Sequence, residues 1–421
     1  MTDALSRVGD AGLSSLAQNL IGSEVLKISR EVTAMIRSGA AVANLTVGDF
    51  SPKQFQIPVP LRDLIVKNLH DGETNYPPSE GTLQARESVV RFFREKLGLE
   101  YPVESVMIAG GSRPIIYAAY QAVVNRGDKV IYPTPSWNNN HYTYLAGGEP
   151  VELVVGADTN FMPTADMIRP HVRDARLIAV CTPLNPTGTV MAKSEVEAIA
   201  TLVVEENARR EQSGERPLFL LWDQVYWMLT FGDNKHWAPP QVVPESAAYT
   251  IFVDGISKAL AATGIRVGWT VAPPAITAKM SDILGHVGAW APRAEQLAVA
   301  QFLSQHDDIT AFHSTMIREL RLRLDALYDG LMAMKKDGLP VDAIAPQGAI
   351  YLSAQFNLLD RFGTNEEIRK FLLNEAGFAV VPFQAFGLKR EDGWFRLSAG
   401  AVSVQDCVDG LERVRSSLSR A

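Results

Sequence analysis

The most informative stretch of the sequence is TIFVDGISKALAATGIRVGWTV, residues 250–271. Two short runs rich in apolar residues, 250–253 and 267–271, flank a turn that carries Lys258. Such runs predict buried strands. A lone lysine is usually a solvated surface residue, but the neighbours of Lys258 are Gly, Ile, Ala and Leu. Apolar surroundings lower the pKa of a lysine and suit imine chemistry, so this stretch predicts a reactive lysine between two strands.

The same kind of run recurs through the central part of the chain. The other runs lie at residues 106–109, 129–132, 151–155, 177–181 and 218–222. Helical stretches or long connections separate most of them, which is typical of a largely parallel sheet with helices on both faces. We therefore expect an α/β fold whose large domain has a mostly parallel seven-stranded sheet flanked by helices.

A smaller α+β domain is expected from the C-terminal part together with the N-terminal segment. The sequence predicts helices at 25–36 and 315–335 and strands at 42–47, 350–354 and 395–398. The expected boundaries are 1–55 for the N-terminal segment, 56–305 for the large domain and 306–421 for the small C-terminal domain.

Composition argues against several classes of protein. The 421 residues are 47% hydrophobic and 21% charged, an ordinary globular balance. The net charge of -7, without a basic block, gives no support to a nucleic-acid or anionic-membrane surface. The longest apolar run, 218–222, is far shorter than the roughly 20 residues that cross a bilayer. A small-molecule partner is the better expectation.

The cysteines and the N-terminus indicate a reduced cytoplasmic protein. Cys181 and Cys407 have no metal-ligand spacing, so no metal site is expected. Asp3, Arg7 and Asp10 stand where a signal peptide would need an apolar stretch.

Several turns that follow predicted strands carry candidate side chains. Gly110-Gly-Ser-Arg113 precedes a helical stretch, where free N–H groups favour a phosphate. Pro133-Thr-Pro-Ser-Trp137 presents an indole that could stack on a flat cofactor. Asn185-Pro-Thr-Gly188 could donate an amide N–H. Each alone is more typical of an ordinary turn or a core residue, but open α/β sheets bind ligands beyond the carboxyl ends of their strands, where these turns meet.

Charged residues in apolar strands are sharper signals. Asp223 ends a buried strand and needs a cationic partner, for which a protonated pyridine nitrogen would serve. Tyr226 follows three residues later and can point a phenol at the same ring. Arg266 opens an apolar strand and requires an anion such as a phosphate. Arg396 lies inside a β run and matches a carboxylate in bidentate geometry, although a structural salt bridge is an equal alternative.

Taken together, in this order, these segments resemble the class I/II aminotransferases of the fold-type I pyridoxal-phosphate superfamily, which are aspartate aminotransferase-like. The resemblance covers the chain from about Val25 to the C-terminus. It rests on the joint occurrence of Asn-Pro-Thr-Gly at 185–188, Asp-x-x-Tyr at 223–226, Ser-Lys at 257–258 followed by Arg-Val-Gly at 266–268, and Phe-Arg-Leu at 395–397. It implies a transaminase that moves an amino group between an amino acid and a 2-oxo acid.

The resemblance implies a role for each candidate residue. Lys258 would hold pyridoxal 5'-phosphate as a Schiff base and later move the substrate proton. Asp223 would pair with the pyridine nitrogen, and Trp137 would stack on the ring. Asn185 and Tyr226 would bind the ring hydroxyl oxygen.

Further positions match the phosphate and the substrate sites of that family. The phosphate-binding positions are Ser112, Arg113, Ser257 and Arg266. Arg396 matches the clamp on the substrate α-carboxylate, with Asn185 and the backbone near Gly48 assisting. Tyr76 resembles the tyrosine that reaches the cofactor phosphate of the neighbouring subunit, which implies a homodimer with shared active sites.

The choice of substrate stays open at this point. Gly255 replaces a serine that is common in relatives, and 288–296 replaces a more polar stretch. Arg293 or Arg113 would bind a distal carboxylate and favour aspartate or glutamate, the preferred interpretation, whereas Trp290 would line an aromatic pocket. The alternatives to transamination are a β-lyase on the same fold and, less favoured, a non-catalytic ligand-sensing domain.

Overall fold

The structure is a computed structural model that describes residues 12–420. Asp3, Arg7 and Asp10, on which the expected absence of a signal peptide rests, therefore lie outside the described range. In that range no helix combines the length and the apolar character that a membrane crossing requires.

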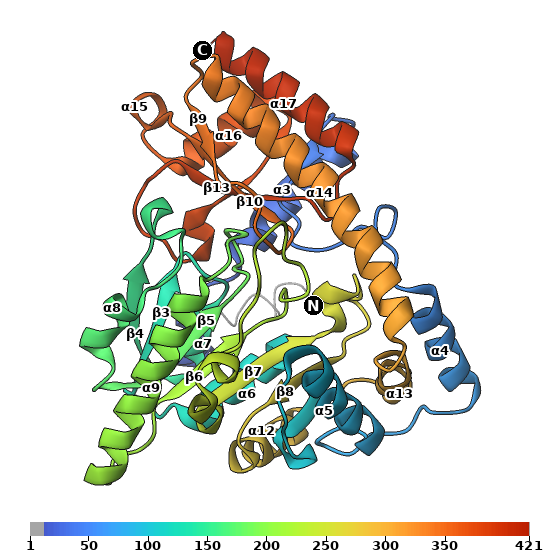
Figure 1. Ribbon diagram of the computed structural model, residues 1–421. Helices are drawn as coiled ribbons and strands as arrows, with labels where there is room; N and C mark the ends of the chain where they lie inside the picture. Colours follow the sequence, from blue (N-terminus) through green and yellow to red (C-terminus); the bar gives the residue numbers. More distant parts are fainter. Residues whose placement is uncertain (1–11, 421) are drawn as a thin grey trace.

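A seven-stranded sheet forms the centre of the larger part of the molecule (Figure 1). Its strand order is β2-β8-β7-β6-β5-β3-β4, and only β8 runs antiparallel to its neighbours. The strands are β2 (Val106–Ala109), β3 (Lys129–Thr134), β4 (Glu149–Val154), β5 (Ala175–Cys181), β6 (Phe219–Asp223), β7 (Thr250–Gly255) and β8 (Gly268–Val271). Each lies on one of the seven predicted runs, so the expected fold class is confirmed.

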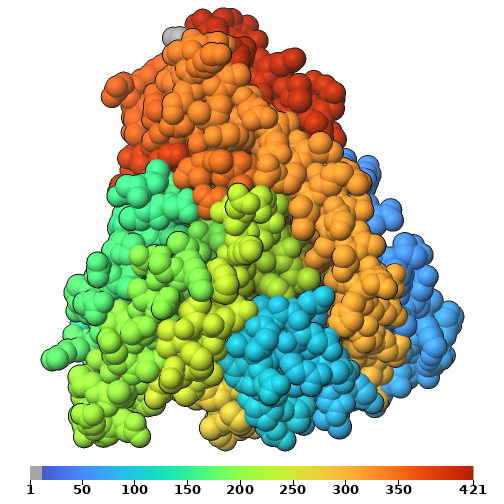
Figure 2. Space-filling view, in the orientation of Figure 1, coloured from blue at the N-terminus to red at the C-terminus, as the bar shows by residue number. Residues whose placement is uncertain are grey.

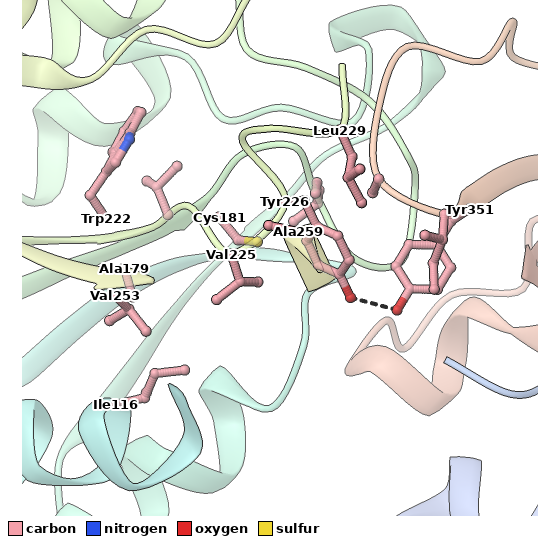
Figure 3. Packing of buried hydrophobic residues seen from close by; sticks show 14 of the residues in the cluster. Ile116, Ala179, Cys181, Trp222, Val225, Tyr226, Leu229, Val253, Ala259 and Tyr351 are labelled. Carbon is pink, nitrogen blue, oxygen red and sulfur yellow. Dashed lines mark hydrogen bonds between the residues drawn. The ribbon is translucent and has the colours of Figure 1, made fainter. Parts of the chain in front are cut away.

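Continuous burial explains why these strands could be predicted. Every residue of β5 and β7 is buried, because helices cover both faces of the sheet. The helices of this part are α4 (Val59–His70), α5 (Leu83–Leu97), α6 (Ser112–Val123), α7 (Asn139–Ala146), α8 (Ala165–Ile168), α9 (Lys193–Ser213), α10 (Pro239–Val242), α11 (Ile256–Ala259), α12 (Pro274–Val287) and α13 (Arg293–Phe302). Ile116 of α6 faces Ala179 and Val253, whereas Trp222 points to the other side of the sheet (Figure 3).

The smaller α+β part contains a four-stranded antiparallel sheet and a two-stranded parallel one. The strands are β9 (Val341–Ala343), β10 (Tyr351–Phe356), β12 (Val381–Pro382) and β13 (Trp394–Ser398) in the first sheet, and β1 (Ala43–Asn44) and β11 (Phe378–Ala379) in the second. Its helices are α2 (Ser15–Asn19), α3 (Glu24–Arg37), α14 (His306–Lys336), α15 (Leu359–Phe362), α16 (Asn365–Ala376) and α17 (Val404–Ser419). The pairing of β1 with β11 joins the N-terminal segment to the C-terminal part.

The two parts pack directly on each other. In Figure 2 the orange and red C-terminal residues lie on the green and yellow middle of the chain. Helix α14 begins at His306 and runs along both parts (Figure 1). The boundaries after residues 55 and 305 stay predictions.

The predicted strand at 42–47 is shorter than expected and covers only Ala43–Asn44. Leu45 still accepts a backbone bond from Ser398, but the chain then turns away from the sheet. The carbonyls of the next three residues, 46–48, accept hydrogen bonds from side chains instead. The strand ends early because its backbone is used to build the cavity described next.

Candidate active site

A cavity of about 470 Å³ lies where strands of the large sheet end and the smaller part packs over them. All predicted site residues except Tyr76 and Arg293 line it. They are Gly48, Ser112, Arg113, Trp137, Asn185, Asp223, Tyr226, Ser257, Lys258, Arg266 and Arg396. The structure thus brings together side chains that are up to several hundred residues apart in the sequence.

Lys258 lies on the short helix α11, directly after β7. Its Nζ donates a hydrogen bond to the carbonyl of Gly48 at 2.7 Å. The pKa of Lys258 is lowered to about 8, chiefly by burial; the nearby Arg396 and Arg113 contribute to this shift, and Asp49 opposes it. A large fraction of the amine is therefore neutral just above neutral pH, which is the form that attacks a carbonyl.

Asp223 ends β6 beside Cys181 of β5. Burial raises the pKa of Asp223 to about 7, and a hydrogen bond from the backbone N–H of Val225 opposes this shift. Asp223 forms no ion pair with any described residue. A deep carboxylate without a cation fits a protonated ring nitrogen, as expected from the sequence.

Tyr226 shares a hydrogen bond with a residue that the sequence did not single out. Its hydroxyl oxygen lies 2.6 Å from that of Tyr351 on β10 (Figure 3). Tyr351 also lines the cavity, and its ring lies 4.8 Å from the guanidinium carbon of Arg396. Burial raises the pKa of both phenols, so both stay protonated. A tyrosine within an apolar β run is typical of the core, and no other signal in the sequence pointed to it.

Arg396 is a cation that is 1% exposed and has no carboxylate partner among the described residues. It donates to Asn185 Oδ1 at 3.1 Å and to the carbonyl of Thr46 at 2.6 Å. Its guanidinium carbon lies 4.8 Å from the ring centre of Tyr351 and 4.8 Å from that of Phe386. A buried unpaired cation is costly unless an anion binds, so this geometry fits a carboxylate ligand.

The N-terminus of α6 forms a concave anion site. Arg266 donates to the carbonyls of Thr263 and Gly110 at 2.7 and 2.8 Å, and a Cβ at Gly111 would collide with its guanidinium. The free N–H groups of α6 begin at Ser112. Within the described chain Arg266 has no carboxylate partner. Helix dipole, N–H groups and an unpaired cation together fit a phosphate.

Close backbone packing explains the glycine at 255. A Cβ on Gly255 would lie 2.8 Å from the Cα of Gly268 and 2.9 Å from the carbonyl oxygen of Val267. There is no room for a serine between β7 and β8, so the hydroxyl contact that the family resemblance would place at this position is excluded. Ser257 remains in the cavity as a hydroxyl donor.

Arg113 and Trp137 form a pair on the wall of the cavity. The guanidinium carbon of Arg113 lies 5.1 Å from the centre of the Trp137 ring. Arg113 is exposed and makes no ion pair with any residue in the described range. Its charge is therefore available to a ligand.

Positive charge exceeds negative charge in the cavity. The cationic side chains that line it are Arg113, Lys258, Arg266 and Arg396, and the anionic ones are Asp49 and Asp223. Asp49, which the sequence also did not single out, accepts a hydrogen bond from Thr263 Oγ1 at 2.6 Å. The excess suits a ligand or ligands with several negative charges. Residues 12–420 contain no cluster of three His, Cys, Asp or Glu side chains that could hold a metal ion.

Arg293 and Tyr76 lie outside this cavity. Arg293 Nε donates to Glu73 Oε2 at 2.5 Å, so its charge is already paired. Tyr76 is 80% exposed, and its ring packs against Trp290 with 5.2 Å between ring centres. All four residues line a separate surface hollow. The fold of one chain therefore brings neither predicted residue to Lys258.

Comparisons with known proteins agree with this geometry. The family model described as aminotransferase class I and II matches residues 40–414. The chain is 28% identical over 380 residues to the aspartate aminotransferase of Bacillus sp. (strain YM-2), covering 89% of this chain and 92% of that protein. It is 29% identical over 416 residues to the aspartate/prephenate aminotransferase of Thermus thermophilus, covering 97% of this chain and 100% of that protein. The structure of the Thermus thermophilus aspartate aminotransferase with maleate superposes with a TM-score of 0.86 at 27% identity, covering 97% and 100% of the two chains.

Proposed function

Since the chain belongs to the class I and II aminotransferase family, we propose that its cavity holds pyridoxal 5'-phosphate on Lys258 and transfers the amino group of an acidic amino acid to a 2-oxo acid. The observation that carries the proposal is one of charge. Asp223 is a deep carboxylate that pairs with no described cation, and Arg266 and Arg396 are cations that pair with no described anion. All three share one cavity with Lys258, whose pKa is lowered.

The side chains divide between the parts of the cofactor by their chemistry. Asp223 would accept a hydrogen bond from the protonated ring nitrogen, and Trp137 would stack on the ring. Asn185 and Tyr226 would contact the ring hydroxyl. The phosphate would be held by Ser112, Arg113, Ser257 and Arg266 together with the N-terminus of α6. When bound, pyridoxal phosphate supplies a carbonyl that condenses with amines and a protonated ring that accepts electrons from the substrate Cα.

Lys258 supplies both the attachment point and the proton transfer. The hydrogen bond from its Nζ to Gly48 holds the amine in the cavity. Because burial lowers its pKa to about 8, the neutral amine is well populated near pH 8. As a free amine, the same Nζ would serve as the base that takes the proton from the substrate Cα and holds it for return.

Arg396 orients the substrate. Two of its nitrogens donate hydrogen bonds to Asn185 and to the Thr46 carbonyl, and the rings of Tyr351 and Phe386 pack against its guanidinium. A planar donor held in this way matches a carboxylate better than a flexible ammonium does. An α-carboxylate bound here would share the cavity with Lys258, which would convert a bimolecular encounter into an oriented reaction.

An acidic donor, aspartate or glutamate, is the substrate class that the charges favour. Arg113 is the cation of the cavity that is both exposed and free of an ion pair, whereas Arg293 is neutralised by Glu73. The names of relatives that act on aspartate support the same choice. Arg113 would then bind the distal carboxylate in addition to lying near the phosphate.

We also infer a homodimer. Tyr76 is 80% exposed beside Trp290 in a hollow at the surface, which is an unusual place for two large aromatic rings unless another chain covers them. A second copy would use Tyr76 to complete the phosphate site of its partner.

A panel of single amino acids tests the proposed function. Protein loaded with pyridoxal phosphate is mixed with one amino acid at a time, and the absorbance of the bound cofactor is followed. We expect aspartate and glutamate to convert it to the pyridoxamine form, and a 2-oxo acid to reverse the change. Absence of conversion with every common amino acid, or release of ammonia and pyruvate without an acceptor, contradicts the proposal.

A further inference from the structure

A second buried carboxylate lies behind the site, on the opposite face of the sheet. Asp254 is the penultimate residue of β7 and is 1% exposed. Val253 is in register with Asp223 of β6, and successive side chains of a strand point to opposite faces. Asp254 therefore points away from the cavity, into a small apolar hollow lined by Phe92, Trp227 and Trp269 among others.

The side chain of Asp254 accepts hydrogen bonds from the end of its own strand and from the loop after β6. Its Oδ1 accepts from the backbone N–H of Gly255 at 2.7 Å. Its Oδ2 accepts from Trp227 Nε1 at 2.9 Å and from Gln224 Nε2 at 3.3 Å. Gln224 and Trp227 belong to the loop after β6, whereas Asp254 and Gly255 lead into α11.

These two loops carry the proposed catalytic groups. Gln224 directly follows Asp223, and Trp227 directly follows Tyr226. The loop after β7 carries Lys258. The last backbone bond between β6 and β7 runs from Gln224 N to Val253 O at 3.0 Å, and no further backbone hydrogen bond joins the two loops in the described chain. Beyond that bond, the hydrogen bonds from Gln224 and Trp227 to the carboxylate of Asp254 connect the two loops.

The charged form of Asp254 is destabilised by burial, and this cost argues against a side chain that serves only as a structural hydrogen-bond acceptor. Asp254 forms no ion pair with a described residue, and burial raises its pKa to about 7. The third member of the network, His236, lies 3.2 Å from Gln224 Oε1, but burial lowers its pKa to about 3, so it supplies no positive charge. Asp223 on the adjacent strand adds repulsion. A neutral acceptor would satisfy fewer donors at a lower desolvation cost.

We infer that Asp254 is a positioning residue for amino transfer. Its side chain holds the loop of Asp223 and Tyr226, and its backbone continues into the loop of Lys258. One rigid carboxylate therefore sets the ring-binding groups relative to the amine. The inference rests on the function proposed above for the cavity.

The test compares Asp254→Asn with wild type in the loaded enzyme. Asparagine keeps the shape of the side chain but has only one acceptor oxygen. That oxygen can serve either Gly255 or the pair Gln224 and Trp227, and the NH₂ group then faces the donors that are left. One of the two loops therefore loses its hydrogen bonds. Loss of groups that orient catalytic residues typically costs about 10- to 100-fold, and we expect kcat to fall by about that factor while KM for the amino donor changes less than about threefold. The pH midpoint of the cofactor absorbance should shift as well, because Tyr226 and Asp223 move relative to Lys258.

Glu206→Gln is the matched control. Glu206 is also a buried carboxylate that accepts several hydrogen bonds, from Arg209 and Arg210, but it lies on α9 outside the cavity. We expect a lower melting temperature for this variant, with kcat and the absorbance midpoint of wild type. Trp227→Phe removes the indole N–H together with the five-membered ring and keeps an aromatic side chain, so it should shift kcat and the midpoint in the same direction as Asp254→Asn, by a smaller factor.

The outcomes separate the possibilities. If Asp254→Asn lowers only the melting temperature, as Glu206→Gln does, Asp254 is structural and the inference is overturned. If Asp254→Asn does not fold, Trp227→Phe decides: a shifted midpoint and lower kcat support the inference, and wild-type values refute it. Failure of wild type itself to convert its cofactor with any amino acid contradicts the proposed function instead.

Discussion

Replacing Arg396 by lysine keeps a positive charge at the substrate site and removes its geometry. In the structure two guanidinium nitrogens donate to Asn185 and to the Thr46 carbonyl, and two aromatic rings pack against the guanidinium. A lysine ammonium cannot make both protein contacts and also face a carboxylate with two parallel N–H groups. The variant therefore loses orientation rather than charge.

The expected size of the effect follows from the lost contacts. A hydrogen bond to a charged group contributes about 1.5 to 3 kcal/mol, and we expect about 3 kcal/mol for losing the bidentate contact. At 1.36 kcal/mol for each factor of ten, kcat/KM for aspartate with 2-oxoglutarate should fall by about 10²-fold. The absorbance of the bound cofactor should stay as in wild type, because Arg396 is assigned to the substrate.

Two comparisons make the assay decisive. Arg323→Lys changes another buried arginine, which binds the Val402 carbonyl and Gln54 in the smaller part. We expect it to lower stability and to leave kcat/KM unchanged. An amine without an α-carboxylate should react equally slowly with wild type and Arg396→Lys. A variant with wild-type kcat/KM for aspartate, or an equal loss for the amine, would refute the reasoning.

Three further predictions follow from the same cavity. Because burial lowers the pKa of Lys258 to about 8, this lysine loses its proton at a lower pH in the folded protein than in the unfolded chain. The free energy of unfolding of the cofactor-free protein should therefore rise with pH, from about pH 8 toward the ordinary lysine pKa. Chemical denaturation should show that this rise is missing in Lys258→Ala. With pyridoxal phosphate at saturating concentration, because Arg113 is also assigned to the phosphate, Arg113→Met should lower kcat/KM for aspartate about tenfold more than kcat/KM for alanine, the scale of one charge-assisted hydrogen bond; equal losses for both substrates in steady-state assays would contradict a distal carboxylate site. Tyr351→Phe removes the hydrogen-bond partner of Tyr226 and should move the pH midpoint of the cofactor absorbance, with kcat reduced by no more than about tenfold; a pH titration that overlays wild type would show that the two phenols are not coupled.

The large sheet and most of the cavity were open to prediction for a physical reason. Parallel strands buried on both faces are continuous apolar runs, so Asp223 and Lys258 are conspicuous at their ends. The same reasoning applies to Asp254, which ends the run Thr-Ile-Phe-Val-Asp, and an acid at the end of a buried strand was a signal that could have been followed there too.

The remainder depends on contacts between distant parts of the chain. The strands β11 and β12 have two residues each, too few to show a period. The bond between Tyr226 and Tyr351 joins residues 125 apart, and the ion pair of Arg293 with Glu73 joins residues 220 apart. Local sequence patterns carry no information on such pairings, so Tyr351 was missed and Arg293 was assigned a substrate role that one chain does not support.

The central claim is that Lys258 carries the cofactor, and the most direct test is to locate the attachment. Protein loaded with pyridoxal phosphate is reduced with borohydride, digested and analysed by mass spectrometry. We predict a single phosphopyridoxyl group on the peptide that contains Lys258, and none in Lys258→Ala treated in the same way. A group on another lysine, or an unmodified Lys258 in protein that still transfers amino groups, would contradict the assignment.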